Sequence, residues 1–180
     1  MPQISQAVKL DHKLVRDAYS QLLNTKPEER GSPNEFIWDL YRYLIVEDLV
    51  MTPALDNHVA GGGERHRRLS DDHESINGKL RHMQLFSPDS ASFEAALRAI
   101  WIDLEPHIRE EATATGDLAR LEEGMSRAAS EALGRKYDNI KGLLQKPYGN
   151  DGVPDAETLA ALLAMPRQEL MVRIGVPASA

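Results

Sequence analysis

The chain of 180 residues contains no cysteine, and this absence excludes several kinds of chemistry at once. Disulfide bonds, thiolate metal sites and cysteine nucleophiles all require a thiol. Basic residues are outnumbered by acidic ones, 21 against 28, so the formal net charge is −7. The densest basic cluster, residues 65–68, reads RHRR and is too short to predict a nucleic-acid surface. We interpret this cluster as the solvated start of a helix.

Hydrophobic runs of transmembrane length are absent as well, because no apolar stretch approaches about 20 residues without a charge. The first residues, MPQISQAVKLDHK, lack the basic-then-apolar pattern of a signal peptide. We therefore expect a cytoplasmic protein with neither a membrane nor a nucleic acid as its partner. Its length fits one domain with a sizeable core.

Strand-like alternation is missing too, and helical periodicity runs along the whole chain. Four long amphipathic stretches, separated by glycine, proline and serine signals, predict helices over residues 5–23, 33–58, 64–85 and 91–113. Ser32 and Pro33 are typical of a helix start. Pro53 lies inside the second stretch and is expected to kink its last turns.

Shorter helices are expected in the C-terminal third. One lies between Gly116 and Gly124, a fifth helix covers residues 126–144, and one or two more within residues 156–174 are interrupted by Pro166. Short connections between long helices favour antiparallel neighbours. The predicted fold is all-α, an up-down-up-down four-helix bundle with additional C-terminal helices. We divide it into a bundle with its fifth helix, residues 1–145, and a C-terminal loop with short helices packed on the bundle, residues 146–180.

The second predicted helix carries an unusual pair of charges. Residues 42–50 read RYLIVEDLV and place two adjacent carboxylates, Glu47 and Asp48, inside an apolar segment. A buried carboxylate is costly unless it is paired, hydrogen-bonded or bound to a metal. Glu47 shares the inward stripe with Tyr43, whereas Asp48 lies one step round and is expected to pair with a basic side chain, such as an arginine of a neighbouring helix.

Each of the other long helices also directs a potential metal ligand toward the bundle axis. His12 lies on the apolar face of the first helix, His73 on that of the third, and His107 with Glu111 on that of the fourth. At about 1.5 Å of rise per residue, His12, Glu47, His73 and His107 lie roughly 12–16 Å from the same end of the bundle. The other histidines lie near helix ends or off the apolar stripe: His58, His66 and His82.

Five inward residues at one depth therefore predict a metal site, made by His12, Glu47, His73, His107 and Glu111. Imidazole and carboxylate without thiolate suit iron, manganese or zinc, and a carboxylate-bridged di-iron centre is the usual solution in a bundle. A cation beside Glu47 would explain why this carboxylate is tolerated. The alternative interpretation is a polar network in the core without a metal.

At these residues the chain resembles the hemerythrin-like family, also called the HHE cation-binding domain. The similar motifs are Asp11-His12, Asp72-His73, and the His-x-x-x-Glu pair from His107 to Glu111. The phrases VEDLVMTPALDNH and HIREEA resemble the ends of the family's second and fourth helices, and ETLAALLAMPRQEL resembles the C-terminal region of fungal members. The resemblance implies a non-haem iron site, usually di-iron bridged by carboxylates, that binds or reacts with dioxygen.

The chain departs from the family pattern at three positions. The family motif of the second helix begins with His, where this chain has Tyr43. Oxygen-carrying members have a second His in the third helix, where this chain has Asn77, and an Asp in the fourth, where it has Ala112. One metal would thus lose an imidazole, leaving an open coordination position, a weaker second site or a phenolate ligand. A stable oxygen carrier is not expected.

An open coordination position is typical of catalytic metals. The leading hypothesis is an oxidoreductase (oxygenase) that uses iron, mononuclear or di-iron, to activate dioxygen on a small organic substrate; manganese and zinc fit less well. Glu47 and Tyr43 are the expected catalytic residues, with Tyr43 as ligand, hydrogen-bond donor or redox partner, unless its ring merely fills the gap. Two rivals are a non-catalytic iron or oxygen binder, used for storage, sensing or detoxification, and a metal-free helical interaction module.

Overall fold

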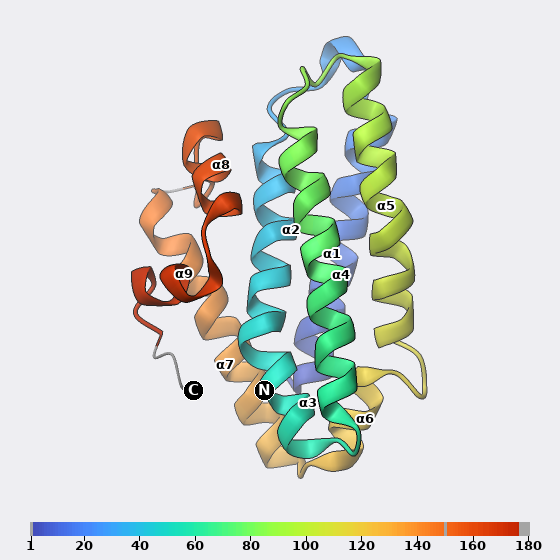
Figure 1. Cartoon of the computed structure of the whole chain (residues 1–180), viewed down its shortest axis with the longest axis vertical. Helices are drawn as coiled ribbons and strands as arrows, with labels where there is room; N and C mark the ends of the chain where they lie inside the picture. Colours follow the sequence, from blue (N-terminus) through green and yellow to red (C-terminus); the bar gives the residue numbers. More distant parts are fainter. Residues whose placement is uncertain (1, 150, 177–180) are drawn as a thin grey trace.

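The computed structural model describes residues 2–149 and 151–176, and this part of the chain is all-helical. Four long rods stand side by side in up-down-up-down order (Figure 1). They are formed by α1 (Ile4–Asn24), α2 (Asn34–Val46) with its continuation α3 (Thr52–His58), α4 (Gly62–Met83) and α5 (Ala91–Glu111). A short 3-10 helix, Pro27–Glu29, lies between α1 and α2. The predicted helical bundle is confirmed.

Helix boundaries follow local hydrogen bonding. The hydroxyl of Ser90 accepts the Phe93 N–H at 3.1 Å and starts α5, as serine caps do by satisfying a free amide of the first turn. The hydroxyl of Ser32 accepts the Asn34 N–H at 3.3 Å at the start of α2. Gly61 adopts the left-handed conformation, with φ of 75°, just before α4 begins.

The second helix was predicted to be one rod kinked at Pro53, but in the structure it is divided by a π-helical turn. Residues Glu47–Met51 form a π-helical turn, in which the Thr52 N–H donates to the carbonyl of Glu47 rather than to that of Asp48. Pro53 has no N–H to continue the helical hydrogen bonds, and the π turn lies directly before it. The distortion therefore begins at Glu47 itself. Such π turns occur frequently at functional sites.

The C-terminal third forms a second layer of helices over α2. This layer contains α7 (Arg127–Gln145), a 3-10 turn (Lys146–Tyr148), α8 (Ala156–Ala164) and α9 (Arg167–Arg173), whereas α6 (Asp117–Gly124) precedes it and packs on α1, α3 and α5. Helix α7 packs on α1 and α2, and α8 packs on α2 and α4 (Figure 1). These positions agree with the expected helices, while the division into domains at residue 145 stays a prediction.

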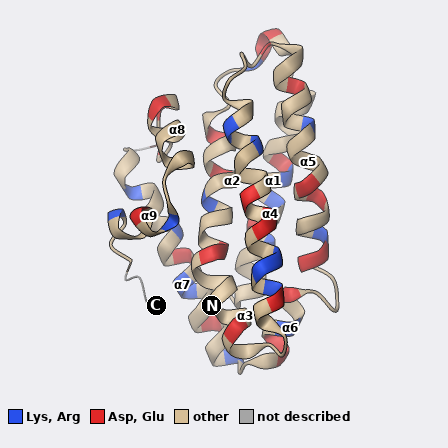
Figure 2. Ribbon diagram, in the orientation of Figure 1, with Lys and Arg blue, Asp and Glu red and all other residues tan. Residues whose placement is uncertain are grey.

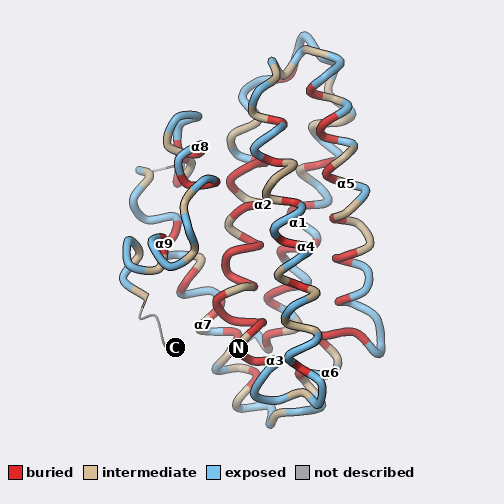
Figure 3. Tube along the Cα trace, in the orientation of Figure 1, coloured by how far each residue is buried: buried red, intermediate tan, exposed pale blue. Residues whose placement is uncertain are grey.

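Because helices cover it on both sides, α2 is the most enclosed rod of the molecule. Figure 3 shows its chain as almost continuously buried. Two of its aromatic side chains attach the second layer: Trp38 Nε1 donates to the Gly152 carbonyl at 2.7 Å, and the Tyr41 hydroxyl donates to the Leu162 carbonyl at 2.5 Å. The enclosure explains why residues 36–46 are nearly all apolar. No helix in the described ranges combines the length and apolar character that a membrane span requires.

Candidate metal centre

Five side chains from four elements meet in the core of the bundle, each no more than 4% exposed. They are His12 of α1, Glu47 of the π turn, His73 of α4, and His107 and Glu111 of α5. Their nitrogen and oxygen atoms form two overlapping groups, each with its atoms within 4.8 Å of one another. One group joins Glu47, His73 and His107, and the other joins His12, Glu47 and Glu111. The residues proposed from the sequence as ligands are thus brought together, with Glu47 common to both groups.

The first group is built around one carboxylate oxygen. Oε2 of Glu47 lies 3.1 Å from Nε2 of His73 and 3.4 Å from Nε2 of His107. The two imidazole rings are 5.0 Å apart between centroids and cross at 73°. Two imidazole nitrogens and a carboxylate therefore face one another in a space that excludes bulk water.

The second group is built around Glu111. Its Oε2 lies 3.0 Å from Nε2 of His12 and 3.7 Å from Nε2 of His107. The hydroxyl of Tyr43 donates to the same oxygen at 3.1 Å, and it lies 3.1 Å and 3.2 Å from the Nε2 atoms of His12 and His107. The hydroxyl of Tyr43, and not only its ring, is therefore part of the cluster.

Two carboxylate oxygens in this cluster have no hydrogen-bond partner among the described residues: Glu47 Oε1 and Glu111 Oε1. Buried acceptors without partners are rare in proteins because each carries its full desolvation cost. A cation between the carboxylates and imidazoles would remove that cost. The donor set, three imidazoles and two carboxylates without thiolate, fits iron, manganese or zinc.

Hydrogen bonds and charges within the cluster shift the pKa values of its members. Burial would raise the pKa of Glu47, but hydrogen bonds from His107 and His73 outweigh it and hold this pKa well below its usual range. Burial would lower the pKa of His73, but its hydrogen bonds to Asp48 and Glu47 raise it to about 9. The pKa of His107 is likewise raised against the effect of burial, chiefly by the charge of Glu111. These directions favour an ionised Glu47 beside protonated imidazoles.

Tyr43 stays protonated in this environment. Burial raises its pKa well above the usual value, and the charges of Glu111 and Glu47 raise it further. A buried, protonated phenol beside a carboxylate acts as a hydrogen-bond donor. The hydrogen bond of the Tyr43 hydroxyl to Glu111 is consistent with the donor role, one of those considered for this residue.

A second set of carboxylates contacts the outer nitrogens of the histidines. Oδ1 of Asp48 lies 2.5 Å from Nδ1 of His73, and Oδ2 of Asp72 lies 3.4 Å from Nδ1 of His107. A carboxylate on Nδ1 fixes the ring so that Nε2 faces the centre, as in many metal sites. The expected pairing of Asp48 with an arginine is confirmed by its ion pair with Arg167. The contacts of Asp48 with His73 and of Asp72 with His107 were not predicted. Each of these aspartates is adjacent in sequence to an expected ligand, Glu47 or His73, but contacts a histidine of another helix.

Two of the three departures from the family pattern, Asn77 and Ala112, supply no imidazole or carboxylate in place of the family's ligands. The side-chain amide of Asn77 donates to the Leu163 carbonyl of α8 at 3.1 Å and is engaged with the second layer. Ala112 is exposed just beyond the end of α5. The three histidines that were not expected to be ligands lie outside the cluster. His66 contacts Asp56, whereas His58 and His82 are exposed.

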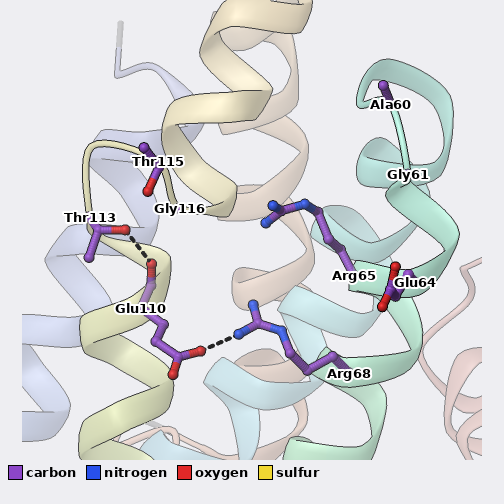
Figure 4. A pocket seen from close by; sticks show the side chains of 9 residues that line it. All are labelled: Ala60, Gly61, Glu64, Arg65, Arg68, Glu110, Thr113, Thr115 and Gly116. Atoms are coloured by element: carbon purple, nitrogen blue, oxygen red, sulfur yellow. Dashed lines mark hydrogen bonds and ion pairs between the residues drawn. The ribbon is translucent and has the colours of Figure 1, made fainter.

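The basic cluster at the start of α4 is more than a solvated helix start, and that interpretation is wrong for two of its members. Arg65 and Arg68 both form ion pairs with the fully buried Asp117 of α6, at 2.8 Å for Arg68, and Arg68 also pairs with Glu110. Figure 2 shows these blue segments near red ones of α5 and α6, and Figure 4 shows the cleft of about 660 Å³ beside them. Acidic partners therefore neutralise both arginines. The same ion pairs connect three helices, α4, α5 and α6.

Comparisons with known proteins agree with this geometry. The profile of the hemerythrin HHE cation-binding domain matches residues 3–119, which include all five core residues. A protein of Schizosaccharomyces pombe, described as an uncharacterized hemerythrin-like protein, is 24% identical over 176 residues, covering 94% of this chain and 85% of the yeast protein. No solved structure matches the chain significantly.

Proposed function

The chain belongs to the hemerythrin HHE cation-binding family, and we propose that it holds iron in the bundle core and acts as an oxidoreductase that uses dioxygen. Domains of this family bind metal ions, typically iron. The observation that carries the proposal is the pair of buried carboxylate oxygens without partners, Glu47 Oε1 and Glu111 Oε1, among three inward histidines. Such an arrangement is costly unless a cation completes it.

The two groups of residues would hold metal with different strength. Glu47, His73 and His107 converge on one carboxylate oxygen, Glu47 Oε2, and would form the stronger position, although the Tyr43 hydroxyl also lies 3.2 Å from Nε2 of His107. The hydroxyl of Tyr43 lies within hydrogen-bonding distance of His12 and Glu111, and it would compete with a metal for these two side chains. We propose one firmly held iron and a weaker second position, with Glu47 bridging or chelating.

Iron bound here would supply one-electron redox chemistry and an affinity for dioxygen. The chain itself would supply a dry cavity and a proton. The Tyr43 O–H is held 3.1 Å from Glu111 Oε2 and 3.2 Å from His107 Nε2, so a proton could pass between these groups without entry of water. Glu47 and Tyr43 are therefore the proposed catalytic residues, acting with a small organic molecule as the electron donor or substrate.

The non-catalytic alternative, an iron or dioxygen binder, is favoured by the enclosure of the centre. Clefts of about 660, 600 and 440 Å³ are lined by none of the five core residues. A recess of about 190 Å³ reaches His73, which is room for roughly six water molecules. This size suits dioxygen and restricts an organic substrate to a small one.

Oxygen consumption separates the two functions. The full chain is loaded with Fe²⁺ under anaerobic conditions, and dioxygen uptake is then followed with an electrode in the presence of ascorbate as the electron donor. An oxidoreductase consumes many equivalents of dioxygen per iron, whereas a binder stops at about one. The His107→Ala variant reports any consumption by free iron. A chain that takes up no iron overturns both functions and leaves the metal-free interaction module.

A further inference from the structure

We infer that Arg167, in the C-terminal helix α9, is a positioning residue that orients His73 for metal binding through Asp48. This inference rests on the proposed metal site. Arg167 lies outside residues 3–119, the part that matches the family profile. The C-terminal layer would therefore be a functional part of the metal centre.

An unbroken line of contacts connects the second layer with the core. The guanidinium of Arg167 forms an ion pair with Oδ2 of Asp48. The other oxygen of Asp48, Oδ1, lies 2.5 Å from Nδ1 of His73, whose Nε2 lies 3.1 Å from Glu47. Asp48 thus divides its two oxygens between α9 and the imidazole.

Burial increases inward along this line. The Arg167 side chain is 31% exposed, that of Asp48 is 15% exposed, and that of His73 is 1% exposed. All three line the recess of about 190 Å³ described above. Without its arginine, the Asp48 carboxylate would be free to turn toward water in this recess, because only one of its oxygens would still be held.

The orientation of Asp48 matters because a metal would bind the opposite nitrogen of His73. A carboxylate on Nδ1 holds the ring so that Nε2 faces the centre and makes that nitrogen a better ligand, and losing such a partner typically weakens metal binding by about 10–100-fold. The corresponding contact between Asp72 and His107 is longer, at 3.4 Å. His73 is therefore the ligand most dependent on its outer carboxylate.

Docking of the second layer does not depend on Arg167 alone. Helix α8 is held by the bonds of the Leu162 and Leu163 carbonyls to Tyr41 and Asn77, and α9 buries Leu170. Removing the guanidinium should thus leave the fold in place. Because coupling between two events is reciprocal, metal binding should in turn stabilise the docked position of α9.

Cobalt(II) is a suitable probe because its visible absorption reports the geometry of its ligands. Metal-free full-length protein is titrated with Co²⁺ for the parent chain, Arg167→Ala, Arg167→Lys and Arg173→Ala. Arg173 is an exposed arginine of the same helix and serves as the matched control. We expect about tenfold weaker binding for Arg167→Ala, partial recovery for Arg167→Lys, and no change for Arg173→Ala.

A double-mutant cycle with Asp48→Asn tests whether Arg167 acts through Asp48. If it does, Arg167→Ala changes Co²⁺ affinity by less than about twofold in the Asp48→Asn background. Hydrogen exchange of residues 167–173 should also slow when Co²⁺ binds the parent chain. Equal affinity of the parent chain and Arg167→Ala, or full additivity in the cycle, overturns the positioning role. A parent chain that binds no Co²⁺ and no iron overturns the proposed function instead.

Discussion

The hydroxyl of Tyr43 donates a hydrogen bond to Glu111 across the bundle core, 3.1 Å from Oε2. Tyr43 stands where the resemblance to the hemerythrin-like family calls for a metal-binding histidine. The phenol thus binds one oxygen of Glu111, Oε2, while the other, Oε1, has no hydrogen-bond partner among the described residues. The centre is asymmetric as a result, because the hydroxyl contacts His12 and Glu111 of one group and His107 of the other.

Replacing Tyr43 by Phe should separate the role of the hydroxyl from that of the ring. The bundle should still form, because the ring volume is kept, but the loss of one buried hydrogen bond should lower the free energy of unfolding by about 1 kcal/mol. Dioxygen consumption by the iron-loaded protein should fall while iron content stays the same. If activity, iron content and visible spectrum all match the parent chain, Tyr43 serves only in packing.

Replacing Tyr43 by His should increase the number of metal ions bound. The imidazole precedes Glu47 by four residues on the same helical face and completes a His-x-x-x-Glu pair. Elemental analysis after loading with iron should show a rise from about one toward two ions per chain. An unchanged ratio would mean that Tyr43 does not limit the second position.

The histidines of the stronger group should be indispensable for metal. We expect His73→Ala and His107→Ala each to lose most of the bound metal, because no nearby side chain can supply a second imidazole. His82→Ala is the control, since His82 is exposed on α4 and contacts Phe86 instead. Full metal content in the His107→Ala protein would disprove the assigned site.

Removing the metal should destabilise the fold. A ligand present at about 100 times its dissociation constant stabilises the native state by about 2.7 kcal/mol, which corresponds to a melting temperature roughly 5–10 °C higher in a chain of this size. Calorimetry after treatment with a chelator should show this loss, and added iron should restore it. Identical melting curves with and without metal would favour the interaction module.

The first residue of α4, Gly62, should not tolerate a side chain. A Cβ atom on Gly62 would lie 2.0 Å from the backbone carbonyl oxygen of Leu55, so Gly62→Ala should destabilise the protein by about 2 kcal/mol or more. The matched control is Gly78, inside α4, where a Cβ meets nothing within 4 Å. Gly78→Ala should be stabilising by about 0.5–1 kcal/mol in urea unfolding.

Periodicity was sufficient to predict the helices and to place five inward residues at one depth. Those features depend on side chains a few positions apart in one helix, which the sequence displays directly. Contacts between distant segments were beyond that reasoning. Arg65 and Asp117 are 52 positions apart, and Arg167 is 119 positions from Asp48. The π turn also escaped prediction, because the apolar residues around Glu47 are equally compatible with a regular helix.

The π turn at residues 47–51 has a consequence for how the second rod faces its neighbours. An α-helix advances by about 100° per residue, so one additional residue in a turn rotates everything that follows by about that angle. The sequence positions that face the core in α3 are therefore shifted by about one residue, and the buried Leu55 there approaches Gly62 of α4. Residues 34–58 thus form two helical segments whose inward faces are set separately. Substitutions in residues 52–58 can adjust the connection to α4 without rotating the Tyr43 and Glu47 side chains.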